Sequence, residues 1–234
     1  MTRARQGTGT LALVGGGEWQ AGSEGLDSDL LARSGGTEVV VLPTAAAFEH
    51  PGRVVERATT WFERLGATVR PLMVLNRREA ESDDAVHAVA EARFLYLSDG
   101  SPLHLRSVLK DSRLMAAVLD RYRRGAVLAA SGAGATVLCD PMVDPRGGAY
   151  MLGLGVVSGL AVFPYHGTAA AHLRARSREL QPADAVLAGI DEGTALVRDP
   201  DGTWRAEGRG AVTLYRVGIE PEVVRDAAVG GLPA

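Results

Sequence analysis

One short stretch of the sequence has the residue types of a catalytic turn. Residues 125–138 read Gly-Ala-Val-Leu-Ala-Ala-Ser-Gly-Ala-Gly-Ala-Thr-Val-Leu. The apolar first part predicts a buried strand, the small residues predict a sharp turn, and the last part predicts the start of a helix. A nucleophile elbow has this arrangement, with a reactive side chain on a strained strand-to-helix turn. Small residues flank such a turn because the two backbones approach closely there.

The spacing alone leaves the tip of this turn undecided. A small-x-Ser-x-small pattern is satisfied by residues 129–133, which puts Ser131 at the tip and predicts a serine hydrolase. The same run of small residues fits equally well over 130–134, which puts Gly132 at the tip and leaves no nucleophile. A glycine-rich strand–helix turn without any chemistry is a third interpretation of the same residues.

A nucleophilic serine needs a histidine within hydrogen-bond reach and a carboxylate that orients this histidine. His166 follows a short predicted strand and lies in a loop, where catalytic histidines are common. His172 lies six residues further on, in a predicted helix. Asp191 and Glu192 end another predicted strand, where a carboxylate could orient an imidazole or simply cap a turn.

Three arginines of the 169–180 helix, Arg174, Arg176 and Arg178, could bind a substrate carboxylate, although a solvated helix face explains them as well. No group of His, Cys, Asp or Glu has the spacing of a metal site, and we expect no cofactor. The single cysteine, Cys139, excludes an intramolecular disulfide.

The composition is that of an ordinary globular protein. The chain has 234 residues, of which 46% are hydrophobic and 23% charged, and its formal net charge is −3. The negative charge argues against a nucleic-acid surface. The apolar run after the polar residues 1–10 is too short for a signal peptide or a membrane span. We therefore expect a cytoplasmic protein with no membrane partner.

Alternating strands and helices must position these residues. In the first half the pattern predicts strands followed by loops, with a Gly15-Gly16-Gly17 run at the end of the first strand. Alternation of this kind predicts βαβ units and a mostly parallel sheet. The expected strands are 11–14, 39–42, 69–74, 94–97, 159–163, 185–190, 194–197, 204–206 and 212–217, besides the strand before the elbow. The expected helices are 26–32, 54–65, 79–92, 103–109, 113–122 and 169–180.

Two further features concern the order of these elements. Pro71 places the 69–74 strand at an edge of the sheet or makes it a strand start. Residues 199–202, Asp-Pro-Asp-Gly, predict a hairpin turn, and the strands on both sides of it are expected to be antiparallel.

Four segments taken together resemble the cyanophycinase and dipeptidase E family of serine peptidases. They are residues 13–18 (Leu-Val-Gly-Gly-Gly-Glu), residues 41–47 (Val-Leu-Pro-Thr-Ala-Ala-Ala), the elbow and residues 189–196 (Gly-Ile-Asp-Glu-Gly-Thr-Ala-Leu). The resemblance covers about residues 11–217. It implies an α/β three-layer sandwich with a mostly parallel central sheet, like that of class I glutamine amidotransferases, and antiparallel strands near the C-terminus.

The resemblance also implies roles for individual residues. The family elbow, Gly-Thr-Ser-Ala-Gly-Ala, aligns Gly132 rather than Ser131 with the nucleophile. His166 is the better match for the catalytic histidine and His172 the alternative, since His172, Arg176 and Arg178 fit a His-x3-Arg-x-Arg pattern. Glu192 matches the acidic member of the triad. The resemblance places Gly16, Gly17, Gly100, Ala133 and Arg176 around the substrate. In the family pattern Gly-Gly-Asp-Gln, Gly100 keeps one glycine and Pro102 stands where the glutamine would be.

Two main functions remain open from the sequence, besides a third possibility, an enzyme that uses the same pocket for non-covalent chemistry with His166 or Glu192 as the acid or base. The first is a hydrolase of a peptide or isopeptide bond next to an acidic residue, for which Ser131, His166 and Glu192 are the candidate catalytic residues. The second is a catalytically inactive relative that binds a small peptide or an amino-acid-derived ligand, or a partner, in the same pocket. We expect one α/β domain over 1–234, with frayed tails at 1–10 and 221–234, and leave a homodimer open.

Overall fold

The fold is organised around an eight-stranded sheet. The computed structural model describes residues 8–233 of the chain. The strand order is β16-β13-β12-β1-β5-β4-β2-β3. The five strands from β1 to β3 in this order run parallel, and β12, β13 and β16 each pair antiparallel with their neighbour. The strands of this sheet are β1 (Leu11–Val14), β2 (Glu38–Leu42), β3 (Thr68–Pro71), β4 (Phe94–Leu97), β5 (Val127–Ser131), β12 (Thr194–Arg198), β13 (Trp204–Gly208) and β16 (Ala227–Val229).

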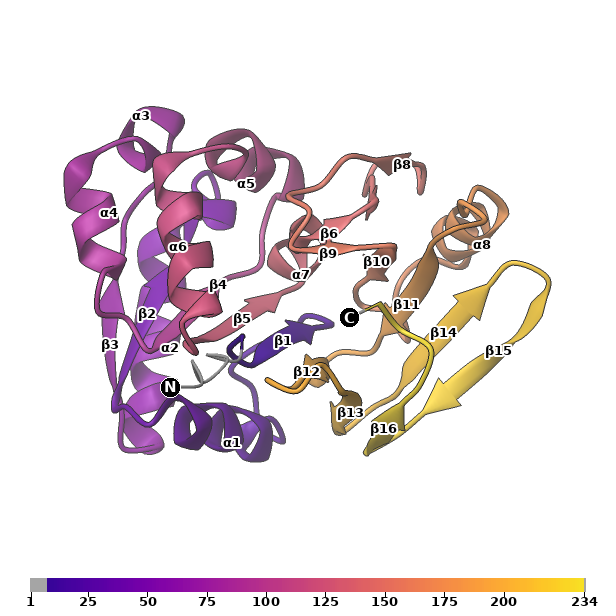
Figure 1. Ribbon diagram of the computed structural model, residues 1–234, viewed down its shortest axis with the longest axis horizontal. Helices are drawn as coiled ribbons and strands as arrows, with labels where there is room; N and C mark the ends of the chain where they lie inside the picture. The colour runs from indigo at the N-terminus through magenta and orange to yellow at the C-terminus, as the bar shows by residue number, and fades with distance from the viewer. Residues whose placement is uncertain (1–7, 234) are drawn as a thin grey trace, which may run out of the picture.

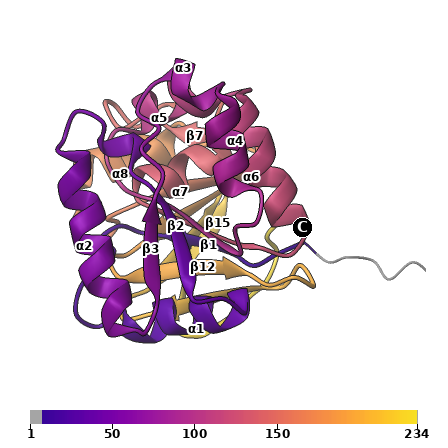
Figure 2. The same cartoon turned by 90° about the vertical axis from the view of Figure 1, so that its left-hand side faces the viewer.

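Helices cover both faces of this sheet. On one face, α1 (Glu24–Ser34) and α2 (Pro51–Arg64) pack on a core that contains Ala129 of β5. The side chain of its neighbour, Ala130, belongs to the core on the other face, because successive residues of a strand point to opposite sides. The elements on that second face are α4 (Asp83–Val89), α5 (Pro102–Leu109), α6 (Arg113–Arg123) and α7 (Ala133–Leu138). Figure 2 shows the two helical layers on either side of the sheet.

A second sheet of four strands lies beside the first, on the right of Figure 1. Its order is β10-β11-β14-β15, with β10 and β11 parallel and the other pairs antiparallel. Its strands are β10 (Leu160–Phe163), β11 (Val186–Ile190), β14 (Val212–Arg216) and β15 (Ile219–Val224). The helix α8 (Ala171–Glu179) and two short strand pairs complete this part; the pairs are β6 (Cys139–Asp140) with β9 (Val157–Ser158), and β7 (Met142–Val143) with β8 (Tyr150–Met151).

The expected fold class is confirmed, including the mostly parallel sheet and the antiparallel strands near the C-terminus. The strand β3 is at an edge of the main sheet, and the 199–202 turn joins β12 to β13 as a hairpin. Within residues 8–233, no helix combines the length and apolar character needed to cross a membrane.

Three local expectations differ from the structure. The expected 79–92 helix is two short helices, α3 (Arg77–Ala80) and α4, because Ser82 caps a new helix by accepting a hydrogen bond from the Ala85 amide. The 69–74 strand ends at Pro71. The expected frayed C-terminal tail instead forms part of β15 and all of β16, and Val229 is buried at 6% exposure. Of the expected N-terminal tail, residues 1–7 lie outside the described residues.

Candidate functional site

Three loops meet where β1, β4 and β5 end. These strands are parallel neighbours, so their carboxyl ends share one edge of the sheet, where open α/β sheets bind ligands. The loops carry the glycine run after β1, the Ser98–Asp99–Gly100 segment after β4 and the turn after β5. The candidate site lies at this edge.

The turn after β5 has the geometry of an elbow, with Gly132 at its tip. Gly132 has φ 49° and ψ −106°, a conformation that strains any residue with a β-carbon. Its amide donates to the Val14 carbonyl at 3.0 Å, and its own carbonyl accepts from the Thr136 hydroxyl at 3.0 Å. Two residues on, a β-carbon at Gly134 would lie 2.9 Å from the Leu97 carbonyl oxygen, so only glycine fits this close approach.

Ser131 lies one residue before the tip, and its side chain points into the protein. Ser131 is 0% exposed, and its hydroxyl donates to Glu18 Oε2 at 2.8 Å. Glu18 is also buried, at 5% exposure, and its Oε1 lies 3.6 Å from the Arg57 guanidinium. Burial, reinforced by the charge of Asp99, raises the pKa of Glu18. Ser131 is thus the donor to a buried carboxyl group.

The carboxylate of Asp99 occupies the space next to the elbow tip. A β-carbon added to Gly132 would overlap the Asp99 carboxyl carbon and both of its oxygens. Asp99 Oδ1 accepts hydrogen bonds of 2.7 Å from the backbone amides of Ala133 and Gly100. In an acyl-transfer enzyme, the amide of the residue after the nucleophile helps to bind the oxyanion. Here that amide binds a carboxylate of the same chain.

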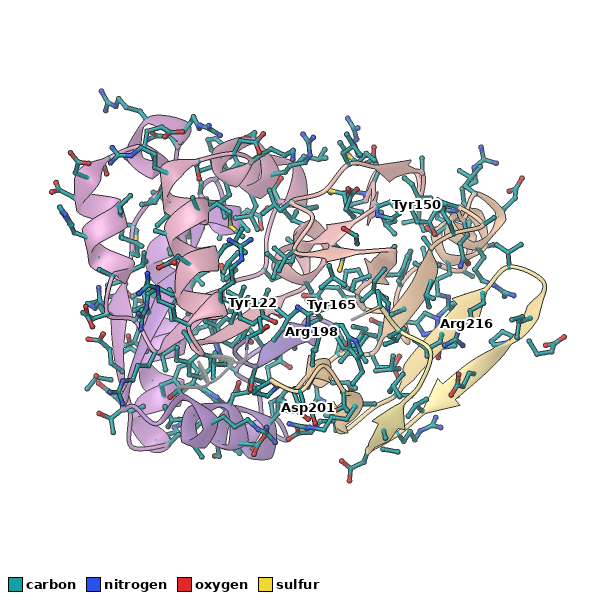
Figure 3. All side chains as sticks on the ribbon, viewed as in Figure 1. Tyr122, Tyr150, Tyr165, Arg198, Asp201 and Arg216 are labelled. Atoms are coloured by element: carbon teal, nitrogen blue, oxygen red, sulfur yellow. The ribbon has the colours of Figure 1, made fainter. Side chains whose placement is uncertain are left out.

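Tyr165 holds the other oxygen of this carboxylate. Its hydroxyl donates a short hydrogen bond to Asp99 Oδ2, and its backbone amide donates to the Gly15 carbonyl at 2.7 Å. A β-carbon on Gly16, which has φ +100°, would overlap the Tyr165 ring, so the glycine run makes room for the phenol. Burial, followed by the charge of Asp99, raises the pKa of Tyr165 well above its usual value. Figure 3 labels Tyr165 near the centre of the molecule, between the main sheet and the second sheet.

His166 follows Tyr165, but both of its ring nitrogens face groups of the second half of the chain. Nε2 lies 2.8 Å from the Tyr215 hydroxyl, and Nδ1 lies 3.5 Å from Asp191 Oδ1. Burial lowers the pKa of His166, and the Asp191 charge partly opposes this shift. A β-carbon on Gly189 would overlap the imidazole, so the ring packs against β11. In this arrangement it is Asp191, and not Glu192, that contacts His166.

The structure places the remaining predicted residues in three different surroundings. Gly100 and Ala133 lie beside the Asp99 carboxylate at the elbow, and Gly17 lies next to the Glu192 side chain. Glu192 is partly buried, with its carbonyl accepting from Arg209. The two α8 residues point to solvent: His172 is exposed, and Arg176 pairs with Glu179 at 3.2 Å. The catalytic and substrate-binding roles of these residues stay predictions.

Two hollows meet at the Asp99–Tyr165 hydrogen bond. The first is a cavity of about 230 Å³ between the elbow, the 143–148 loop and α8. Its wall is mostly apolar and includes Pro102, Val143, Phe163, Ala169 and Leu173. The second is a polar hollow of about 460 Å³ against the start of α2, and its lining includes Gln20, Glu49, His50, Arg53 and Arg57. Asp99, Gly100 and Tyr165 line both. Neither lining includes Ser131, His166, His172 or Arg176.

No group of three or more His, Cys, Asp or Glu residues in the described part of the chain is arranged to hold a metal ion.

Asp99 and Tyr165 are the site residues that sequence reasoning missed. The only signal for them in the sequence was their position: Asp99 and Tyr165 each lie two residues after the end of an apolar strand, β4 and β10 respectively.

Comparison with known proteins places this geometry in a family. Residues 11–203 match the model of peptidase family S51. The cyanophycinase of Trichormus variabilis is 29% identical over 225 residues, which cover 91% of this chain and 75% of the relative. The cyanophycinase of Synechococcus elongatus is 26% identical over 218 residues, which cover 88% of this chain and 67% of the relative.

A solved structure has the same fold over nearly the whole chain. The crystal structure of a peptidase from an acI-B1 Actinobacterium superposes with a TM-score of 0.86 at 26% identity. The superposition covers 96% of this chain and 98% of that one. The resemblance expected from the sequence is confirmed.

Proposed function

The chain belongs to peptidase family S51 and has the scaffold of a peptidase-type hydrolase, and from this premise we propose that it is a member that binds a small ligand without forming a serine acyl-enzyme. The ligand site in this proposal is the 230 Å³ cavity beside the elbow. Cavities lined mainly by apolar groups, with a few convergent polar groups, are typical of small-molecule sites.

The observation that carries this proposal is the position of the Asp99 carboxylate. It fills the volume that a nucleophilic side chain on Gly132 would need, and it occupies the Ala133 amide that would otherwise receive an oxyanion. Acyl transfer needs both the nucleophile and the oxyanion donors. The loss of the side chain at the tip and the presence of a carboxylate there favour binding over acyl transfer.

The alternative function, hydrolysis of a peptide or isopeptide bond next to an acidic residue by Ser131, His166 and Glu192, draws its support from the family match. It would require the Ser131 hydroxyl to leave Glu18 and turn from the buried face of β5 toward a cavity that Ser131 does not line. A general base must also lie within hydrogen-bond reach of the nucleophile. His166 instead lies next to Tyr215 and Asp191.

The test is active-site labelling with a fluorophosphonate probe, which reacts covalently with activated serines. We expect the full chain to remain unlabelled at a probe concentration that fully labels an unrelated serine hydrolase in the same tube. Ser131→Ala is the matched variant, since it removes only the hydroxyl oxygen. Labelling of the wild-type protein that disappears in Ser131→Ala would overturn the proposal and establish the hydrolase.

A further inference from the structure

The cavity beside the elbow contains the carboxylate of Asp99, which has no cationic partner among residues 8–233. We propose that the ligand is a small amine, in which a protonated amino group pairs with Asp99 and a short apolar body fills the rest of the cavity. This inference rests on the proposed function, because it names the chemistry of the ligand for the same site.

The first argument is the charge balance of the cavity wall. The three groups bound to Asp99 are two backbone amides and a phenol, all of them neutral. No Lys, Arg or His of residues 8–233 forms a salt bridge with Asp99. Asp144, the other carboxylate on the wall, is already neutralised by Arg146 through bonds of 2.6 and 2.9 Å. A partly buried charge is costly without a counter-charge, so a cation in this cavity is favoured at Asp99.

The second argument is the hydrogen-bonding capacity that remains. A carboxylate accepts about four hydrogen bonds, and Asp99 has three, of which only one is on Oδ2. Thr136 also lines the cavity, and its hydroxyl uses its hydrogen on the Gly132 carbonyl, so the hydroxyl oxygen can still accept. An ammonium group has three donors and no acceptor. An ammonium group can therefore donate to both Asp99 Oδ2 and the Thr136 hydroxyl oxygen, and it adds no acceptor that would itself need a donor.

The third argument is what the cavity excludes. The amides of Gly100 and Ala133, which could bind a ligand carboxylate, already donate to Asp99. An anionic ligand would therefore approach Asp99 with no free donor between the two charges, and like charges disfavour binding. The cavity therefore favours a ligand with a positive charge next to Asp99 and disfavours a ligand with a negative charge there.

The fourth argument is size and polarity. The volume of about 230 Å³ exceeds the roughly 150 Å³ of an engineered apolar cavity that binds benzene, so it has room for one small substituted ring. Pro102, Val143, Phe163 and Leu173 provide an apolar wall for the body of the ligand. A single aromatic ring or a branched alkyl chain fits this wall, with the amino group toward Asp99.

The test is calorimetric titration of the full chain at neutral pH with three probes of nearly equal shape. Benzylamine is the cation, benzyl alcohol the neutral analogue and benzoate the anion. We expect benzylamine to bind at least about tenfold more tightly than either of the other two, as a desolvated charge pair requires. Equal binding of the amine and the alcohol, tighter binding of benzoate, or no heat with any probe would each overturn the assignment of an amine.

Two variants locate the cation. Asp99→Asn should remove the tenfold preference for benzylamine while benzyl alcohol binds as before, which also shows that the cavity is intact. Asp144→Asn, which removes the carboxylate already paired with Arg146, should keep the preference. The reverse result for the two variants would overturn the role of Asp99. If Asp99→Asn does not fold, the three wild-type titrations decide the question.

The two proposals fail in different ways. Binding of benzyl alcohol or benzoate in place of benzylamine overturns the assignment of an amine and leaves a ligand-binding cavity. Fluorophosphonate labelling at Ser131 overturns the non-acylating function, whatever the titrations show.

Discussion

At the scale of single residues, the site differs from an acyl-transfer elbow in the group that fills the space at the tip. The tip residue has no side chain, and the Asp99 carboxylate from the neighbouring loop lies in the space that this leaves. The strained backbone at Gly132 is kept, and its amide still donates to the Val14 carbonyl. Glycine relieves the strain of this conformation because it has no β-carbon. The elbow is thus retained in its backbone conformation, and its Ala133 amide donates to the Asp99 carboxylate.

The buried hydrogen bond between Ser131 and Glu18 gives a prediction at this scale. Ser131→Ala removes a donor from a carboxyl group that is 5% exposed, and a buried acceptor left without its donor is costly. We expect the free energy of unfolding to fall by about 1–3 kcal/mol in urea titrations, with the affinity of the cavity for its ligand unchanged. Unchanged stability with a loss of ligand affinity would mean that Ser131 acts in the cavity and not in the core.

At the scale of elements, the C-terminal segment completes the main sheet. The strand β16 pairs with β13, and the Trp204 indole of β13 donates to the Pro233 carbonyl at 2.8 Å. Trp204 and Val229 are both buried, at 4% and 6% exposure. This segment therefore covers one edge of the sheet and part of the core.

Truncation tests this role of the C-terminal segment. A chain that ends at Val224 loses β16 and the burial of Val229, and we expect it to lose about 3 kcal/mol of stability and to show red-shifted Trp204 fluorescence. A chain that ends at Gly231 keeps β16 and loses the Trp204–Pro233 bond and the packing of Leu232 on the core, so it should lose about 1–2 kcal/mol. Equal stability of the two truncated chains would contradict a structural role for β16.

The sequence predicted the elements more fully than the site. The apolar runs of β4 and β5 are fully buried strands between helices, and β2 is buried except for Glu38, so their pattern is visible without any tertiary information. The strand β15 could not be read in this way, because five of its six residues are exposed and its sequence, Ile-Glu-Pro-Glu-Val-Val, contains a proline. Pairing with β14 determines this strand.

The elbow was predicted as a turn, whereas spacing alone did not decide which residue stands at its tip. The local pattern fits Ser131 or Gly132; the family resemblance favours Gly132, and the backbone conformation of Gly132 and the burial of the Ser131 side chain agree with it. The pattern gave no sign that the Asp99 carboxylate lies against this tip. That contact joins Asp99, after β4, to the turn after β5 through side-chain atoms. The same limit applies to His166, whose partners Tyr215 and Asp191 come from β14 and the end of β11. Spacing along the chain does not encode which carboxylate reaches which ring.

At the scale of the whole molecule, buried carboxyl groups make stability depend on pH. Burial raises the pKa of Asp27 from 3.8 to about 7, although its hydrogen bond from the Trp61 indole opposes this shift. The folded state then binds a proton that the unfolded state releases, so the stability that this group contributes is full below pH 3.8 and is lost as the pH rises toward 7. Glu18 acts in the same direction, and His166, whose pKa is lowered, acts in the opposite one.

The Asp27→Asn variant isolates this contribution. Asparagine keeps an acceptor for the Trp61 indole and has no charge to bury. Between about pH 4 and pH 7, we expect the wild-type free energy of unfolding to fall relative to that of the variant, by on the order of a few kcal/mol. Urea titrations at several pH values measure this difference. A constant difference over the range would show that Asp27 is ionised in the folded protein throughout.

The central claim is that the Asp99 carboxylate and a side chain at the elbow tip compete for one volume, and a double-mutant cycle in urea unfolding measures this competition. Gly132→Ser should cost about 3 kcal/mol in the wild-type chain, from overpacking and backbone strain together. In an Asp99→Ala chain, which leaves the volume empty, the same substitution should cost about 2 kcal/mol less. An equal cost of Gly132→Ser in both chains would contradict the claim.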